Sequence, residues 1–283
     1  MTKFLSKDGK FYMRDGKLLG YTPPPPIASL TPQTGITYTT GLSGIEPATL
    51  TLFSQAISNN ADITNSTNTV YLDYEQTHVK IDVGNQVTID LNGTNYAFDV
   101  IGFNHDTLTD ANAYGSATAT GKAGITFQMH DLFATVYQMN SSNTNSGGWK
   151  SSAMRTSTMA TMKGYMPAEW QTAIKVIDKK SGLGDGSSSG TETTSDECFL
   201  LAELEIYDPT YKYIRSVSGE GTQYAYYKAG NSMIKNRDGT AKPWWERSPN
   251  SGNRNRFCLV RNDGESYPYA ADYSCGVAFG FCV

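Results

Sequence analysis

Histidine is scarce in this sequence, with three residues in 283, and its four cysteines form no CxxC pair. The usual spacings of zinc ligands therefore cannot be assembled, and we expect neither a structural zinc site nor a cofactor. Long apolar runs are lacking as well, because charges or glycines interrupt every short apolar group near the N-terminus. We therefore expect no signal peptide and no insertion into a membrane.

An excess of positive charge is also missing, since 23 basic and 27 acidic residues leave a net charge of -4. The chain lacks the positive field that nucleic-acid binding needs, so nucleic acids are not expected partners. Hydrophobic residues make up 39% of the sequence, which is enough for a sizeable core. With only 18% charged residues and 27 glycines, the composition favours short strands and many turns, and the pattern along the chain predicts an α+β fold.

The N-terminal segment contains two Asp-Gly pairs, Asp8-Gly9 and Asp15-Gly16, each between apolar or aromatic groups. Such pairs indicate tight hairpin turns, so we expect three very short strands. A meander of this size buries little by itself, and a frayed tail is the alternative. Residues 1–26 are therefore interpreted as an arm that ends in a stiff proline linker at residues 23–26 and supports homo-oligomer formation or attachment to a virion.

Residues 27–95, the next part of the chain, are expected to form a small mixed α/β module that either stands alone or belongs to the main body. A helix is expected over residues 47–58, where Pro47 suits the first turn and apolar residues share one face. Strands are expected at residues 79–83 and 87–91 and from Tyr96, with a type I′ turn at Asn92-Gly93.

Residues 96–283 are expected to form the main domain. Short helices are predicted near residues 129–137 and 152–162 and after Pro167, with Trp149 anchoring a loop and Ser151 or Ser152 capping the helix after it. Residues 181–195 read as an exposed loop, residues 198–207 as a central strand, and residues 276–283 as a buried last strand.

Catalytic signatures are weak. His105 and His130 each precede an aspartate, but neighbouring side chains diverge on a strand or helix, so a structural role is favoured. No serine lies in a nucleophile-elbow pattern, and no phosphate-binding glycine loop is present. We expect that the protein is not an enzyme.

The C-terminal residues 244–283 alternate a rigid apolar frame with Tyr, Arg and Asn residues, which is the composition of recognition surfaces. An ordinary loop-rich surface is the alternative. Strand alternation places Leu259 and Arg261 on one side, opposite Val260. The expected buried frame comprises Trp244, Trp245, Arg247, Ser248, Phe257, Val260, Gly264, Gly276, Val277, Phe279 and Phe281.

Several segments together resemble bacterial and phage domains of C-type-lectin-like fold related to formylglycine-generating enzymes. They include YAFDVIGFNHD, GITFQMHDLF, DECFLLAELEIY, WWERSP and GVAFGFCV, and the resemblance covers residues 96–283. It implies a twisted antiparallel sheet with short helices. Catalytic relatives oxidise a substrate cysteine, but no matching copper-cysteine motif is present here, so this activity is the least favoured reading.

Proteins with such C-termini are similar to the variable proteins of diversity-generating retroelements, which rewrite adenines in the codons of a ligand-binding surface. The resemblance implies a phage or prophage protein, located in a phage tail or in the bacterial cytoplasm before assembly, that binds a bacterial surface protein or glycan. A phage assembly component without diversified binding is the alternative. The predicted ligand-binding residues, expected to cluster on one exposed face, are Arg254, Asn255, Arg256, Leu259, Arg261, Asn262, Tyr267, Pro268, Tyr269, Asp272, Tyr273 and Cys275.

Overall fold

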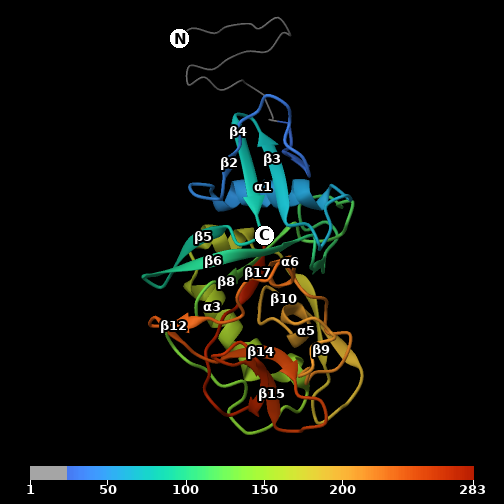
Figure 1. The fold of residues 1–283 in the computed structure, drawn as a ribbon, viewed down its shortest axis with the longest axis vertical. Coiled ribbons are helices and arrows are strands. Elements are labelled where there is room, and N and C mark those ends of the chain that lie inside the picture. Colours follow the sequence, from blue (N-terminus) through green and yellow to red (C-terminus); the bar gives the residue numbers. More distant parts are fainter. Residues whose placement is uncertain (1–23) are drawn as a thin grey trace, which may run out of the picture.

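The computed structural model describes residues 24–283, so the predicted N-terminal arm and the first proline of its linker lie outside the described residues. The described chain is a mixed α+β protein with short helices and several sheets, most of them antiparallel. A small module lies at one end of an elongated molecule, a five-stranded sheet crosses its middle, and a C-terminal sheet lies at the other end (Figure 1).

The small module consists of one helix and a four-stranded sheet. Helix α1 (Pro47–Ser58) begins at the proline that the sequence predicts and buries Leu50, Phe53 and Ile57 completely. The sheet has the order β1 (Ile27–Ser29), β3 (Thr69–Tyr74), β4 (Thr77–Asp82), β2 (Thr39–Thr40).

The five-stranded sheet begins with the predicted hairpin. Asn92 and Gly93 have φ values of 54° and 87°, which confirms a turn of the type I′ kind. The strand before this turn pairs with the strand after it, so residues 86–91 belong to the same sheet as the strand from residue 94. The order of the sheet is β11 (Cys198–Phe199), β17 (Gly280–Cys282), β8 (Ile125–Met129), β6 (Thr94–Phe103), β5 (Gln86–Leu91).

The C-terminus joins the small module to the rest of the protein. The backbone carbonyl of Val283 accepts hydrogen bonds from the Ser54 hydroxyl and from the Tyr114 hydroxyl, the latter at 2.7 Å. A Cβ atom at Gly124 would lie 2.0 Å from the backbone oxygen of Ser54, so only glycine allows this close approach. One continuous apolar core therefore extends from α1 to the last strand.

Short helices lie between Gly148 and Ala173, as predicted for the region after residue 152, and Trp149, which is expected from the sequence to anchor a loop, lies in the first of them. The helices are α2 (Gly148–Ser151), the π-helix η1 (Met154–Thr158), α3 (Met159–Tyr165) and α4 (Ala168–Ala173). Ser152 accepts a hydrogen bond from the Arg155 amide at 3.1 Å, which confirms it as a cap. Trp149 is fully buried and donates its indole N–H to Asp196 at 3.0 Å.

Three predicted elements are wrong. Residues after β8 form no helix, because their backbone pairs with the distant C-terminal segment, for example Phe133 N with Val277 O at 2.9 Å. Residues 198–207 form only the short β11 before helix α5 (Glu203–Ile206) begins, since two buried acidic residues find distant partners there. The expected loop contains a hairpin, in which β9 (Ile177–Gly182) pairs with β10 (Thr191–Asp196), and β7 (Thr107–Leu108) completes that sheet.

The C-terminal sheet has the order β14 (Trp244–Pro249), β15 (Arg256–Val260), β16 (Ser266–Ala270). Its first strand is irregular, since Trp245 pairs with Leu259 and Pro249 with Phe257, which leaves three residues of β14 opposite one of β15. Such a bulge redirects side chains, and here Glu246, Arg247 and Ser248 all become buried. Helix α6 (Ala225–Lys228) and the pair β12 (Asn236–Arg237) and β13 (Thr240–Ala241) precede this sheet.

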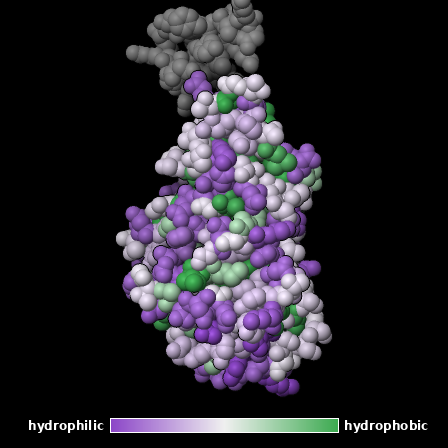
Figure 2. Space-filling model, in the orientation of Figure 1, coloured by the Kyte–Doolittle hydropathy of each residue, from purple (hydrophilic) through white to green (hydrophobic). Residues whose placement is uncertain are grey.

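The predicted frame is buried throughout, except for a partly exposed Gly264. Within residues 24–283 all four cysteines are free and buried, as expected for a reduced chain. No helix in this described part is long and apolar enough to cross a bilayer. On the face shown in Figure 2, apolar residues form only small separate groups among polar ones.

Candidate functional site

A hollow of about 360 Å³ opens beside the hairpin formed by β15 and β16. In this hairpin Leu259 pairs with Tyr267, so the two residues lie on the same face of the sheet. Residues from the ends of both strands and from the segment that follows them line the hollow. We call this site the C-terminal hollow; its lining consists of Pro243, Leu259, Arg261, Asn262, Tyr267, Tyr269, Tyr273 and Cys275.

Three tyrosines form the exposed wall of the C-terminal hollow. Tyr267, Tyr269 and Tyr273 are exposed at 41%, 37% and 51%. The ring centroids of Tyr267 and Tyr269 lie 6.3 Å apart and those of Tyr269 and Tyr273 lie 4.5 Å apart. The rings therefore hold one another while they present broad amphipathic surface to solvent.

Arg261 adds positive charge to this wall. Its guanidinium lies 5.8 Å from the ring centroid of Tyr267 and forms an ion pair of 2.8 Å with Asp263. Its second acidic neighbour, Glu265, lies at 3.7 Å. These contacts restrict the side chain, so less entropy is lost when it donates to a ligand.

The floor of the hollow is apolar. Leu259 and Cys275 are buried and reach the hollow from below, so they are not exposed as the sequence suggested. Cys275 is held by a pair of backbone hydrogen bonds with Tyr137, at 3.0 and 3.1 Å. Burial raises the pKa of the Cys275 thiol to about 12, so the thiol stays protonated and unreactive at neutral pH.

Fully buried tryptophans support the hollow from inside. The indole of Trp245 donates to the backbone oxygen of Tyr137 at 2.8 Å, and that of Trp244 donates to Met233 at 3.1 Å. The amide of Trp245 also donates to Gly276, at 3.0 Å. The floor is therefore fixed by residues whose rotamers are locked by packing and hydrogen bonds.

Seven of the twelve predicted site residues line the hollow, and Leu259 and Arg261 share it as strand alternation predicts. The structure does not bring all twelve together. Pro268 and Asp272 are partly exposed neighbours of the lining tyrosines. Pro243 also lines the hollow, but it precedes the paired tryptophans and carries no signal of recognition in the sequence.

Residues 254–256 lie outside the lining, at the other end of β15. The backbone oxygen of Arg254 accepts from the Asn145 amide at 2.9 Å, and its guanidinium is 3.7 Å from Asp185. Asn255 accepts from the amide of Ala271, also through its backbone oxygen. Arg256 is exposed on the opposite pleat from Leu259, so these three residues do not share the hollow.

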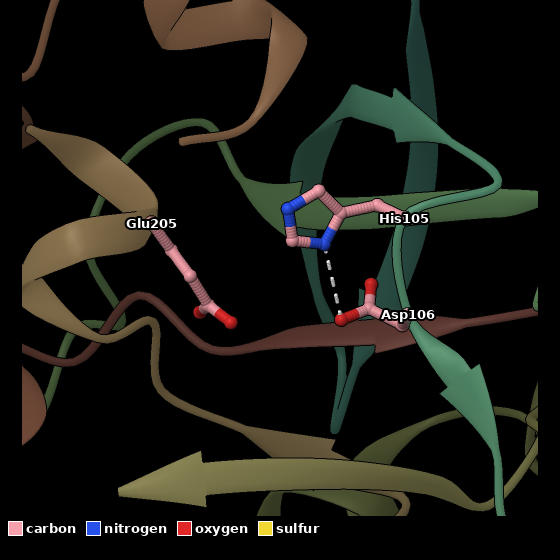
Figure 3. A group of neighbouring side chains, drawn as sticks. All are labelled: His105, Asp106 and Glu205. Atoms are coloured by element: carbon pink, nitrogen blue, oxygen red, sulfur yellow. Dashed lines mark hydrogen bonds and ion pairs between the residues drawn. The ribbon is translucent and has the colours of Figure 1, made fainter. Parts of the chain in front are cut away.

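A different group of chemically active side chains lies at the centre of the protein: His105, Asp106 and Glu205 (Figure 3). His105 Nδ1 lies 3.4 Å from Asp106 Oδ1, so these neighbours do meet, contrary to the expectation from strand geometry. The reason is local, since β6 ends at Phe103 and Asn104 has a left-handed backbone with φ 45°.

Two buried cations match the two carboxylates of this group. Lys179 Nζ lies 2.7 Å from Asp106 and 2.6 Å from Glu205, and Arg247 binds Glu205 through both guanidinium ends. Burial opposes ionisation, but Lys179 and His105 hold the pKa of Asp106 well below its usual value. Arg247 and Lys179 likewise lower the pKa of Glu205 against the effect of burial. The group therefore fits a balanced ion network that holds the core elements together.

The remaining histidine-aspartate neighbours diverge as predicted. His130 Nδ1 contacts Asp99 at 2.9 Å, whereas Asp131 accepts from the Asn236 amide at 2.9 Å. Neither side chain is arranged to share a proton with the other.

Residues 123–283 match a family described as a domain of unknown function, DUF6273. The match covers more than half of the chain, so the protein belongs to this family. The matched region includes the whole C-terminal hollow. Of the three residues in Figure 3, only Glu205 lies within it, and His105 and Asp106 precede it. No curated protein and no solved structure matches the chain.

Proposed function

We propose that this member of the DUF6273 family is a ligand-binding protein that recognises a bacterial surface protein or glycan through the C-terminal hollow. The observation that carries the proposal is the grouping of Tyr267, Tyr269 and Tyr273, all substantially exposed, around one hollow. Exposed aromatic side chains that are held in place without being buried are typical of recognition surfaces.

The dimensions and chemistry of the hollow support this function. About 360 Å³ is within the usual range of small-ligand sites, which accommodates one sugar unit or one protruding side chain. Tyrosine supplies contact area at low entropic cost, and Arg261 and Asn262 supply hydrogen-bond donors at the rim. The floor lies on packed strands, which favours affinity through preorganisation.

We further propose that the domain has a C-type-lectin-like fold and that its surface is diversified by a retroelement, in a phage tail or in a bacterium that carries the phage. The residue types support this, because asparagine codons altered at adenines can encode Tyr, Ser, Arg, Asp, Leu, Pro and Cys. Five of those types, Pro, Leu, Arg, Tyr and Cys, together with asparagine itself make up the whole lining. A reverse-transcriptase gene and an adenine-rich repeat of the C-terminal coding sequence nearby would test the proposal, and their absence would contradict it.

The proposed function is binding without catalysis. The thiol nearest to the hollow, Cys275, is protonated at neutral pH, and the central carboxylates are engaged by Lys179 and Arg247. This thiol and these carboxylates are thereby held in structural roles.

Binding of the fluorescently labelled full chain to a panel of intact bacteria tests the proposal. A strain that is bound then supplies purified envelope proteins and glycans as defined probes. Replacing Tyr267, Tyr269 and Tyr273 together by serine should abolish binding to the cells and to the purified probe.

The matched control replaces two tyrosines of the small module, Tyr38 and Tyr71, whose rings pack 5.1 Å apart far along the chain from the hollow. This variant should bind normally. Equal binding by the wild type and the triple variant, with both folded, would refute recognition through the hollow and favour an assembly role.

A further inference from the structure

A second cluster of buried ligand atoms lies between α5 and the C-terminal sheet. Oxygen atoms of Glu203 and Glu246 and the sulfur of Cys258 all lie within 4.8 Å of one another. The three residues come from α5, β14 and β15, and all are fully buried. Across the bulge in β14, Glu246, Arg247 and Ser248 lie opposite Cys258, and Glu246 is buried.

Glu246 is the unusual member of this cluster. Among residues 24–283, neither of its carboxylate oxygens has a hydrogen-bond partner, although both are buried. Glu203 differs, since it accepts from the amides of Arg215 and Ser216 at 2.8 and 2.6 Å and from the hydroxyl of Ser266. A buried carboxylate without partners is costly, so Glu246 must be either protonated or paired with a cation.

In the neighbouring ion network of Asp106, Glu205, Lys179 and Arg247, the negative and positive charges are equal in number. There, two carboxylates meet two cations at 2.5 to 2.9 Å. In the second cluster, no lysine or arginine of the described chain lies within ion-pair distance of Glu203 or Glu246, and Arg247 is directed to Glu205 instead. The second cluster therefore has an excess of negative groups and an orphaned carboxylate that faces them.

We propose that Glu203, Glu246 and Cys258 bind one zinc ion. A thiolate with carboxylates suits zinc, whereas calcium and magnesium take oxygen ligands only. On binding, the Cys258 thiol and the protonated Glu246 carboxyl each release a proton to solvent, so the ion's two positive charges meet three negative ligands. Arg215, whose charge acts on Cys258, offsets the remaining negative charge. The sequence gives no sign of this site, because its ligands are 43 and 12 residues apart and form no zinc-binding motif.

A buried site of this kind links α5 to two strands of the C-terminal sheet. Because it is formed only in the folded chain, zinc should stabilise the protein as it binds. The site lies on the strands that also support the C-terminal hollow, but the proposal is independent of ligand recognition there.

Metal analysis of the full chain tests the proposal. Protein stripped with a chelator and then exposed to a small excess of zinc should retain one ion per chain after gel filtration, and its Tm should rise with zinc. Cobalt in place of zinc should give the near-ultraviolet absorption of a cobalt-thiolate bond. Both the retained ion and the absorption should be lost in Cys258→Ser and weakened in Glu246→Gln.

Cys198→Ser is the matched control, since Cys198 is also buried but lies outside the cluster, and it should retain both signals. If Cys258→Ser does not fold, Glu246→Gln decides, because glutamine keeps the shape of the side chain. A wild-type chain whose Tm and metal content do not respond to zinc would overturn the proposal, as would a cobalt-thiolate signal that persists in Cys258→Ser. In either case Glu246 is simply protonated, which agrees with the effect of burial on its pKa, raised well above the usual value.

Discussion

The two outer strands of the C-terminal sheet, β14 and β16, differ in where their polar side chains lie. Both flank β15, but every residue of β14 is buried, whereas in β16 exposed residues alternate with buried or partly exposed ones. The bulge in β14 directs Arg247 and Ser248 to partners in the core. The regular pairing of β16 presents Tyr267 and Tyr269 to solvent.

This difference assigns stability to one edge of the small sheet and ligand binding to the other. The buried edge ties the sheet to α5 through the Arg247–Glu205 ion pair and to β9 through a hydrogen bond from Arg247 to the backbone oxygen of Lys180, which fixes the position of β15. On the exposed edge, the side-chain contacts of the three tyrosines are with one another and with Arg261, and none of them is an ion pair in the core. Substitutions on β14 should therefore reduce stability, and those on β16 should reduce binding.

The largest expected effect comes from Arg247→Leu. The guanidinium binds Glu205 at both ends and donates to the backbone oxygens of Lys180, Leu200 and Glu220. Removing one partner of a buried ion pair leaves an uncompensated charge, so the free energy of unfolding should fall by about 3–5 kcal/mol. Urea unfolding followed by tryptophan fluorescence measures this change.

Arg261→Leu on the exposed side is the matched control. Its ion pairs with Asp263 and Glu265 are solvent-exposed, so the change should be no more than about 1 kcal/mol. Equal losses for the two arginines would remove the distinction between the edges.

A second prediction concerns the pH dependence of the buried edge. Burial raises the pKa of Glu220 from 4.5 to about 7, and repulsion by Glu203 acts in the same direction. Hydrogen bonds from Ser248 and from the Gly182 amide, together with the charge of Arg247, lower this pKa but do not cancel the effect of burial. Since the folded state holds this proton more tightly than the unfolded state, stability is full below about pH 4.5. It decreases as the pH rises to about 7, by roughly 3 kcal/mol.

Glu220→Gln isolates this contribution, because other groups titrate in the same range. The difference in unfolding free energy between wild type and variant should change between pH 4.5 and 7 and remain constant above pH 8. A difference that does not depend on pH would show that Glu220 titrates normally.

Ser248→Ala should have a smaller effect. The hydroxyl of Ser248 accepts from the Glu203 amide at 2.9 Å and donates to Glu220. Alanine leaves both groups buried without this partner, which should cost about 1–3 kcal/mol. The control is Ser274→Ala, which changes an exposed residue beside the hollow and should leave the midpoint of urea unfolding unchanged. Similar midpoints for Ser248→Ala and Ser274→Ala would contradict the prediction.

The parts of the fold that the sequence predicts are those that local interactions determine. Helix α1 begins at Pro47, and the hairpin of β5 and β6 turns at Asn92-Gly93, because those residues favour these backbone angles by themselves. The segment after Met129 is different. Its apolar spacing imitates a helix, but its amides pair with residues near 277, almost 150 positions away, and no local pattern records such pairing.

The candidate site also has a part that short sequence segments predict and a part that depends on distant contacts. Alternation along β15 and the abundance of tyrosine indicate the residues of the hollow, since both are properties of short segments. The exclusion of residues 254–256 depends on contacts with Asn145 and Asp185, which lie more than 60 positions away. The buried groups around Glu203 and Glu246 could not be predicted either, because a sequence that reads as a strand gives no sign of acidic side chains directed into the core.

The smallest expected effect on stability comes from the tyrosines of the exposed edge, and there the two edges differ most clearly. Tyr269→Ser removes a ring that is 37% exposed and touches mainly Tyr267 and Tyr273, so the free energy of unfolding should change by only about 0.5 kcal/mol. Binding to the bacterial envelope probe should nevertheless weaken at least ~10-fold, because the central aromatic residue of a recognition surface usually contributes more than 1 kcal/mol. Tyr269→Phe keeps the ring and should retain most of the affinity if stacking dominates. If Tyr269→Ser instead lowers stability as much as Arg247→Leu while binding is retained, the tyrosines belong to the structural frame, and recognition must be sought on another face.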